Sequence, residues 1–321
     1  MDYSTLLLNL GLVIVSIGML WKGSDWVVES SSKLAHAWGV SDLVIGLTVV
    51  AIGTSAPEFA VTISAVLTGK ADISVSNVVG SNIFNLGFIL GGTACVYAIP
   101  TTRKLVYRDG FFLIGTTILL SFFLFDFHLP GTEMALSRME GVVLIALLVS
   151  YLIYLFIKKE DLGERITHGK VSYLDVVLLL IGIAGVVGGG HLLVESSTAI
   201  ARAFGVSDWV IGVTIVAAGT STPELATSMM ALIKGKHGMA IGNLIGSDLF
   251  NLLGVLGVAG ILRESLQVSA EAQGSMLMLV AMVLLVVFFM RTNWQLSRFQ
   301  GLILVVINMI RWFYDFLGKS V

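Results

Sequence analysis

Long apolar runs separated by short polar segments are the main pattern along the chain. Residues 73–102, 141–157 and 272–290 contain no charged side chain at all. A helix that crosses a membrane needs about 17–25 predominantly apolar residues, and these runs meet that requirement. The pattern predicts ten spanning helices at residues 5–34, 41–68, 73–98, 110–125, 140–157, from 171 onward, 207–233, 239–261, 272–290 and 299–316.

The composition supports an all-α integral membrane protein. Only 12% of the 321 residues are charged and 56% are hydrophobic, whereas soluble domains are about 25% charged. A very apolar soluble helical protein is the alternative, and the lengths of the apolar runs argue against it. The single cysteine, Cys95, excludes a disulfide framework and a thiolate metal cluster. We expect membrane lipid as the surroundings, with no nucleic acid and no obligate protein partner.

The second half of the sequence repeats the first at a constant offset of 166 residues. The pairs of matching segments are VESS at 28–31 and 194–197, GVSD at 39–42 and 205–208, and NVVGSNIFN at 77–85 with NLIGSDLFN at 243–251. Five predicted spans separate equivalent points, and five is odd, so the two copies must cross the membrane in opposite directions. Inverted repeats of this kind are the architecture of many secondary transporters.

This repeat divides the chain into two five-helix halves, residues 1–160 and 161–321, with the strongest similarity between residues 29–91 and 195–257. The 19 basic residues are distributed unevenly over the predicted loops, with six on the side of the N-terminus and thirteen on the other side. Cytoplasmic loops carry the excess of Lys and Arg. We therefore expect a multi-pass protein of the cell membrane with both termini outside the cytoplasm.

A helix break beside a carboxylate occurs in the second and seventh predicted spans. The sequence GTSAPE at residues 53–58 returns as GTSTPE at 219–224. Proline removes a backbone hydrogen bond and breaks a helix, and an ionisable residue at membrane depth indicates a functional site. Glu58 and Glu224 could instead be surface carboxylates or members of a buried salt bridge. No Lys or Arg lies between residues 33 and 70 or between 202 and 234, which favours a bound cation as their counter-charge.

The broken helices also offer uncharged oxygen ligands. We expect the breaks to release backbone carbonyls for coordination, and the neighbouring hydroxyl groups to add further ligands. The carbonyls are those of Thr54, Thr220, Ala51 and Ala217, and the hydroxyls include those of Ser55 and Ser221. Ordinary hydrogen bonding between helices is the alternative for any single hydroxyl.

A second motif in each half supplies a facing wall. Ser81 and Asn85 lie one helical turn apart, as do Ser247 and Asn251, so each pair shares one face of its helix. Their hydroxyl and amide oxygens suit sodium or calcium, although helix packing through small polar residues would explain them too. Asp248 is acidic where the first half has Asn82. It could lie at the margin of the site, on an access path or on a polar rim.

These two motifs closely resemble those of the cation/calcium antiporter superfamily, in particular prokaryotic sodium/calcium exchangers. The resemblance covers both repeat segments and extends to the ten-span layout. It implies that Glu58, Glu224 and the carbonyls of Thr54 and Thr220 hold calcium. It further implies that sodium positions are completed by the carbonyls of Ala51 and Ala217 with Ser55, Ser81, Ser221 and Ser247, and that Asn85 and Asn251 face the middle. Some members have an aspartate where this chain has Asn251.

The expected function is secondary active exchange of calcium for sodium by alternating access. Two glutamates carry two negative charges, which one calcium ion or two sodium ions neutralise. The resemblance implies that the first and sixth spans slide over a fixed core. A calcium/proton antiporter on the same scaffold is the main alternative, and a channel is a weaker one. An intramembrane hydrolase would need a base beside the GTS motifs, and none is present, so we expect no enzyme and no cofactor besides the transported ions.

Overall fold

The computed structural model describes residues 3–69, 71–125, 135–158, 171–205, 217–263, 265–267 and 271–317. In the first half the elements are α1 (Tyr3–Trp38), α2 (Asp42–Ile45), the π-helix η1 (Gly46–Val50), α3 (Ala51–Thr54), α4 (Ala56–Leu67), α5 (Ala71–Phe84), the π-helix η2 (Asn85–Leu90), α6 (Gly91–Val96), β1 (Ile99–Pro100), the π-helix η3 (Leu105–Gly110), α7 (Phe111–Phe125), β2 (Ala135–Ser137) and α8 (Arg138–Ile157).

The described elements of the second half follow a similar order. They are α9 (Tyr173–Ala203), α11 (Ala217–Gly219), α12 (Thr222–Ile233), α13 (His237–Leu249), the π-helix η5 (Phe250–Val255), α14 (Leu256–Leu262), β3 (Ser265–Gln267), α15 (Glu271–Arg291), the 3-10 helix η6 (Thr292–Trp294), β4 (Gln295–Leu296) and α16 (Arg298–Leu317). The predicted span 207–233 begins outside the described residues. The predicted division of the halves, at residue 160, also lies outside them.

Seven of the described helices are long and apolar enough to cross a membrane, and a bent pair of helices adds an eighth span. Of the two remaining predicted spans, one contains α11 and α12 in its described part, and the other corresponds to α16. Where both ends are described, the helices begin and end within a few residues of the predicted limits. The exceptions are α1, which continues to Trp38, and the fourth span, which begins at Leu105.

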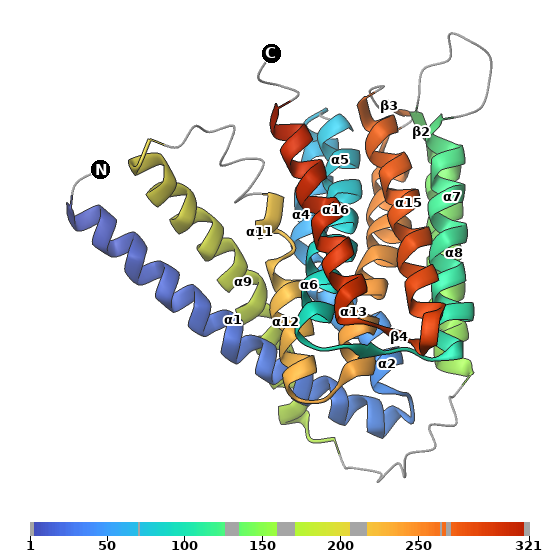
Figure 1. Ribbon diagram of the computed structural model, residues 1–321, viewed down its shortest axis with the longest axis horizontal. Helices are drawn as coiled ribbons and strands as arrows, with labels where there is room; N and C mark the ends of the chain where they lie inside the picture. The colour runs from blue at the N-terminus through green and yellow to red at the C-terminus, as the bar shows by residue number, and fades with distance from the viewer. Residues whose placement is uncertain are drawn as a thin grey trace.

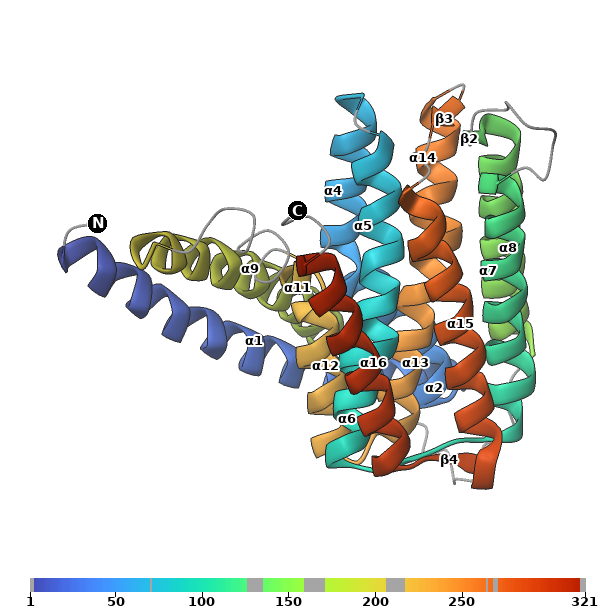
Figure 2. The same cartoon turned by 45° about the horizontal axis from the view of Figure 1, so that its top comes forward.

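Two long helices lean away from the rest of the molecule. Figure 1 and Figure 2 show α1 and α9 side by side and inclined to the upright helices, which include α4, α5, α7, α8, α15 and α16. Gly23 and Gly182 allow the pair to approach closely, because a Cβ on either glycine would lie 2.9 Å from the backbone oxygen of the other. Small residues at such a crossing are typical of packed membrane helices.

The break in the second span is a bend of 48° between residues 42–54 and 56–67. Ser55, with φ −80° and ψ 11°, separates α3 from α4, and Pro57 lies in the first turn of α4. Proline fits the first turn of a helix because its missing N–H has no partner to lose there. Ser221 has nearly the same backbone angles, φ −88° and ψ 7°, before Pro223 in α12. The sequence therefore breaks both spans at equivalent positions.

Two short antiparallel ribbons, which the all-α prediction did not include, connect the halves. β1 pairs with β4 and β2 pairs with β3, so each ribbon joins a strand of the first half to one of the second. Figure 1 shows β2 and β3 at the opposite end of the bundle from β4. The strand residues Ile99, Leu296, Leu136 and Leu266 are buried, so the ribbons close the two ends of the hydrophobic core.

The two halves approach each other closely where η1 and α13 meet. A Cβ at Gly46 would lie 2.7 Å from the backbone oxygen of Met239, and a Cβ at Gly246 would lie 2.6 Å from the backbone of Leu47. Backbone atoms cannot move aside as a flexible side chain can. These glycines therefore hold the broken second span against α13, which places the polar residues of the two motifs face to face.

Candidate ion-binding site

Glu58 and Glu224 lie in the centre of the protein, each in the first turn of the helix that follows a break. Both side chains are completely buried. The two carboxylates are close enough to interact electrostatically. Neither forms an ion pair with a Lys, Arg or His of the described part of the chain. The structure thus brings the two predicted acidic residues together in the buried interior.

Each glutamate accepts a hydrogen bond from the serine of the other half. Ser55 Oγ donates to Glu224 Oε1 at 2.9 Å, and Ser221 Oγ donates to Glu58 Oε1 at 3.2 Å. Ser247 Oγ also lies 3.4 Å from Glu224 Oε1. Each serine lies three residues before the glutamate of its own helix. The crossed hydrogen bonds therefore bring the two turns at the helix breaks into contact. This exchange of hydrogen bonds fixes one oxygen of each carboxylate.

The other oxygen of each carboxylate has no hydrogen-bond partner among the described residues. Glu58 Oε2 and Glu224 Oε2 are both buried and unpartnered. A buried charged oxygen without a partner is costly, and almost all buried polar groups in proteins are satisfied. Two such oxygens, on carboxylates that also accept hydrogen bonds from Ser221 and Ser55, form a donor set for a hard cation.

Asn77 and Asn243 support the backbone of the two glutamates. Asn77 Nδ2 lies 3.4 Å from the Glu58 carbonyl oxygen and 3.0 Å from Thr62 Oγ1. Asn243 Nδ2 makes the equivalent contacts, 3.4 Å to the Glu224 carbonyl oxygen and 3.0 Å to Ser228 Oγ. The two asparagines hold the first turns of α4 and α12 in place.

Thr54 connects the first half to α13. Its hydroxyl lies 3.1 Å from Asn243 Oδ1, 3.4 Å from Ser247 Oγ and 3.3 Å from the Ala51 carbonyl oxygen. The carbonyl of Ala51 also accepts the N–H of Ser55 at 3.0 Å. The expectation that the break releases this carbonyl is therefore wrong, because α3 keeps its hydrogen bond up to Ser55. The Ala51 carbonyl oxygen accepts from both Ser55 N–H and the Thr54 hydroxyl, so it could join an ion site only if a cation replaced one of these donors.

The remaining predicted residues lie in or beside the broken helices and in the helices of the second motif, and most of them are buried. Ser55, Ser221, Ser247, Asn85 and Asn251 are fully buried and Ser81 is 3% exposed. Thr220 lies beside Glu58, and Ala217 begins α11. Asn85 is the first residue of the π-helix η2, and Asn251 lies in the π-helix η5. Single π-helical turns within α-helices are frequent at functional sites, and hydropathy gives no sign of them.

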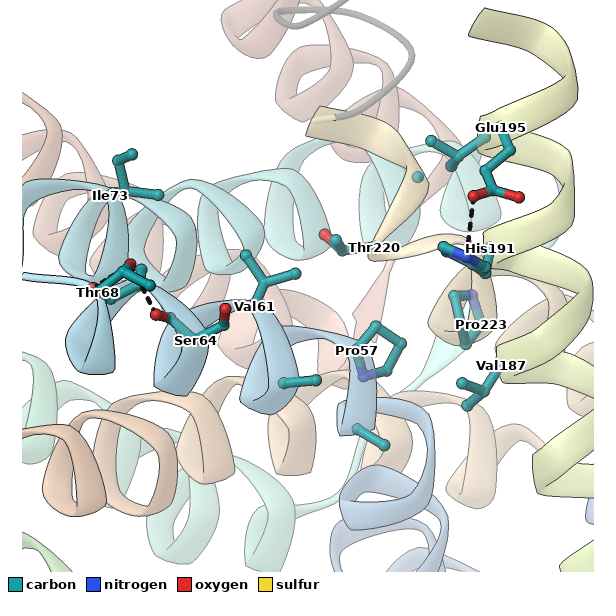
Figure 3. Close-up of a pocket in the computed structure, with 15 residues that line it drawn as sticks. Pro57, Val61, Ser64, Thr68, Ile73, Val187, His191, Glu195, Thr220 and Pro223 are labelled. Carbon is teal, nitrogen blue, oxygen red and sulfur yellow. Dashed lines mark hydrogen bonds and ion pairs between the residues drawn. The ribbon is translucent and has the colours of Figure 1, made fainter. Parts of the chain in front are cut away.

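A cleft of about 890 Å³ lies beside both breaks. Figure 3 shows His191 and Glu195 of α9 on one side of it, and Val61 and Ser64 of α4 with Thr68 just after that helix along its length. Pro57, Thr220 and Pro223 also line it, so the cleft reaches the turns that carry the glutamates. His191 Nε2 lies 3.3 Å from Glu195 Oε1, and both side chains are mostly exposed. Glu29 is likewise half exposed and lies 3.3 Å from Lys33, as expected for a solvated helix position.

Sequence reasoning placed Asp248 at a margin, a path or a rim, and did not assign a role to Asn82. The structure buries both side chains completely between the two halves. Residues 82 and 248 are related by the repeat offset of 166, and equivalent positions of an inverted repeat meet near its axis. This relation could have predicted that the two side chains meet.

Comparisons with known proteins agree with this architecture. The family described as "Sodium/calcium exchanger protein" matches residues 8–157 and 174–310. The sodium/calcium exchanger MaX1 of Methanosarcina acetivorans is 33% identical over 93% of this chain and 95% of its own length. The inner membrane protein YrbG of Escherichia coli is 30% identical over 93% of this chain and 94% of its own.

Among solved structures, the sodium-calcium exchanger NCX_Mj soaked with zero Na⁺ and Ca²⁺ superposes with a TM-score of 0.82 at 33% identity. The match covers 95% of this chain and 98% of that one. Other structures of NCX_Mj were soaked with sodium together with calcium or strontium.

Fold and sequence together define a multi-pass membrane ion transporter, not an enzyme. The chain belongs to the sodium/calcium exchanger family. The predicted all-α fold, with two inverted five-helix repeats and broken second and seventh spans, is confirmed.

Proposed function

We propose that the protein is a secondary antiporter that exchanges calcium for sodium by alternating access. Both ions compete for one chamber built on two glutamates. The proposed ligands are Glu58, Glu224, Thr54, Thr220, Ser55, Ser221, Ala51, Ala217, Ser81, Ser247, Asn85 and Asn251. The transported ions are the ligands of the site, and no resident cofactor takes part.

The unpartnered oxygens of Glu58 and Glu224 carry this proposal. No three His, Cys, Asp or Glu side chains in the described part of the chain are grouped closely enough to hold an ion together. An ion at the glutamate pair therefore takes its remaining ligands from hydroxyl, amide and carbonyl oxygens. Such a set suits calcium or sodium and is unsuitable for softer metals such as zinc.

Charge balance accounts for exchange. The two glutamates carry two negative charges, so one calcium ion or two sodium ions neutralise the pair. Because both loads use the same Oε2 atoms, they exclude each other. A chamber without cations keeps two carboxylates facing each other in a medium of low dielectric constant, where their repulsion is strong. Without bound cations, a change in the side of the membrane to which the chamber opens is therefore unfavourable.

Movement of α1 and α9 over the core would open the chamber to each side in turn. Two contacts place α9 directly over both breaks: a Cβ at Gly53 would meet Ile183, and a Cβ at Gly219 would overlap Val194. Gly190 of α9 also lies next to Pro223. A shift of α9 along its axis would therefore change the cover over both glutamate-bearing turns.

Calcium flux into proteoliposomes tests the choice of counter-ion. Vesicles loaded with sodium and diluted into choline medium with radiolabelled calcium should accumulate calcium, with the pH equal on both sides and a protonophore present. A sodium gradient supplies the driving force in this design, and protons cannot. Vesicles loaded with choline are the control and should stay near background.

A calcium/proton antiporter would give the opposite result. Calcium would then accumulate in sodium-free vesicles when a pH gradient is applied, and the protonophore would abolish the accumulation. This outcome would replace sodium by protons in the proposal and leave the glutamate site in place.

We further propose that the halves are residues 1–160 and 161–321. We also propose that both termini face the outside of the cell membrane, as the distribution of basic residues favours. In a Cys95→Ser background, the thiol of Ser4→Cys should react with a membrane-impermeant maleimide on intact cells. The thiol of Lys158→Cys should react only after the cells are permeabilised. The reverse labelling pattern would invert the orientation.

A further inference from the structure

Residues that line the cleft beside α9 have equivalents at the other end of the bundle. Thr68 and His191 correspond, at the repeat offset of 166 residues, to Lys234 and Asp25. Figure 2 shows α4, which borders the cleft, running to the upper end of the bundle. Figure 1 shows the turn from α12 to α13, which contains Lys234, toward the lower end. The inverted repeat therefore allows the two ends to be compared position by position.

The two ends differ in how closely the long helices cover the core. Val61 of α4 lines the cleft and is 40% exposed. Its equivalent in α12, Thr227, is completely buried, and α1 packs directly on α12. Val28 of α1 is also completely buried, whereas its equivalent in α9, Val194, lines the cleft. The side covered by α9 is thus open, and the side covered by α1 is closed.

An ion pair joins α1 to the core on the closed side. Lys234, the residue after α12, pairs with the carboxylate of Asp25, and its Nζ donates to the Asp25 carbonyl oxygen at 3.3 Å. Both side chains are less than a third exposed, 28% for Lys234 and 23% for Asp25. Glu29 lies farther from Lys234, at 3.7 Å, and is half exposed, so it adds little. The Lys234–Asp25 pair therefore ties α1 to the turn between α12 and α13.

The equivalent positions on the open side cannot form this contact. Thr68 has no charge, and its hydroxyl donates to carbonyl oxygens of α4. His191 pairs with Glu195 of its own helix, α9. The sequence therefore provides an ion pair across the closed side and none at the matching positions of the open side. Because α1 and α9 pack on each other through Gly23 and Gly182, a contact that holds α1 also restrains α9.

We propose that Lys234 and Asp25 are positioning residues for exchange, whose ion pair holds α1 against α12 and favours the conformation in which the cleft beside α9 is open. This inference rests on the proposed function, because it takes access to the glutamates to alternate between the two sides. It deepens that function by naming a contact that biases the two conformations. The pair breaks when α1 moves off α12 and forms again when α1 returns.

The reaction rates of two engineered thiols report the state of the two sides. In a Cys95→Ser background, Val61→Cys places a thiol in the cleft, and Thr227→Cys places one at the equivalent closed position. The purified protein in detergent is treated with iodoacetamide, a small uncharged reagent, at constant pH and ion composition, and mass spectrometry follows the alkylation. Lys234→Gln should raise the Thr227→Cys rate about two- to fivefold, as expected for the loss of one partly exposed ion pair. The same change should lower the Val61→Cys rate.

The Lys234→Gln variant should remain folded, because Asp25 keeps its ion pair with Lys22 at 2.7 Å. Elution as a single species in size-exclusion chromatography verifies this. Lys236→Gln is the matched control, since Lys236 lies in the same turn and pairs with Asp42 of α2 at 3.0 Å, not with α1. Both thiols should react in this control at the rates measured without the substitution.

The inverted repeat also offers a variant with the pair on the other side. Thr68→Lys combined with His191→Asp places a lysine and an aspartate at the matching positions of the open side, and it should slow the Val61→Cys reaction about two- to fivefold.

Two outcomes would overturn the proposal. One is an unchanged rate in Lys234→Gln or in the variant with the transferred pair. The other is a faster Thr227→Cys reaction without a slower Val61→Cys reaction, because loosened packing alone would produce it. Failure of the proposed function would appear separately, as a lack of sodium-driven calcium flux in the wild-type protein.

Discussion

Replacing either interior glutamate by glutamine, as Glu58→Gln or Glu224→Gln, is expected to reduce calcium exchange about 100-fold or more. Loss of one member of a buried charge interaction costs about 3–5 kcal/mol, and each 1.4 kcal/mol is a factor of about ten. Glutamine keeps the size of the side chain and can still accept the hydrogen bond from Ser221 or Ser55. The variants should therefore remain folded while radiolabelled calcium flux into proteoliposomes falls.

Glu29→Gln is the control for this experiment. Its carboxylate is half exposed and interacts with Lys33 and Lys234 on the surface. Exposed ion pairs contribute little, so its flux should match that of the wild-type protein. Wild-type flux in Glu58→Gln or Glu224→Gln would remove these residues from the proposed site.

Gly246→Ala is expected to destabilise the protein and to slow exchange. The new Cβ would lie 2.6 Å from the Leu47 backbone and 2.8 Å from Ala51 Cβ. Forcing extra volume into such a contact costs about 1–3 kcal/mol. The separation of η1 from α13 would also displace Ser247 from Glu224 and from Thr54. Thermal unfolding in detergent and calcium flux measure the two effects.

Gly115→Ala provides the matched comparison. Gly115 is an exposed residue of α7, and a Cβ there would meet no atom of the described residues within 4 Å. Alanine favours the helix by up to about 1 kcal/mol relative to glycine, so stability should be equal or slightly higher and flux unchanged. If Gly246→Ala behaved like Gly115→Ala, close packing of η1 on α13 would not position the site.

The spans and the meeting of the two glutamates were predictable from the sequence. Hydropathy defines a spanning helix because water is absent from the membrane interior, and the constant offset of 166 residues relates the halves. With an odd number of spans between the copies, the GTSAPE and GTSTPE motifs had to approach from opposite sides. The burial of Glu58 and Glu224 agrees with that reasoning.

The finer arrangement of the chamber was not predictable. The repeat relates Ser55 to Ser221, but it does not predict that each serine donates a hydrogen bond to the glutamate of the other half. Nor does apolar periodicity distinguish a π-helical turn at Asn85 from an α-helical one. The carbonyl of Ala51 was expected to be free because proline breaks a helix, yet the break falls after Ser55, whose N–H still reaches it. Such details depend on contacts between distant segments.

Competition between calcium and sodium at the two glutamates is tested most directly by equilibrium binding of radiolabelled calcium to the purified protein. Wild-type protein should bind calcium at the chamber and release it as sodium replaces choline at constant ionic strength. The protein carrying both Glu58→Gln and Glu224→Gln should bind none there. Calcium binding that sodium does not displace, or that persists in this double variant, would contradict the shared site on which the account depends.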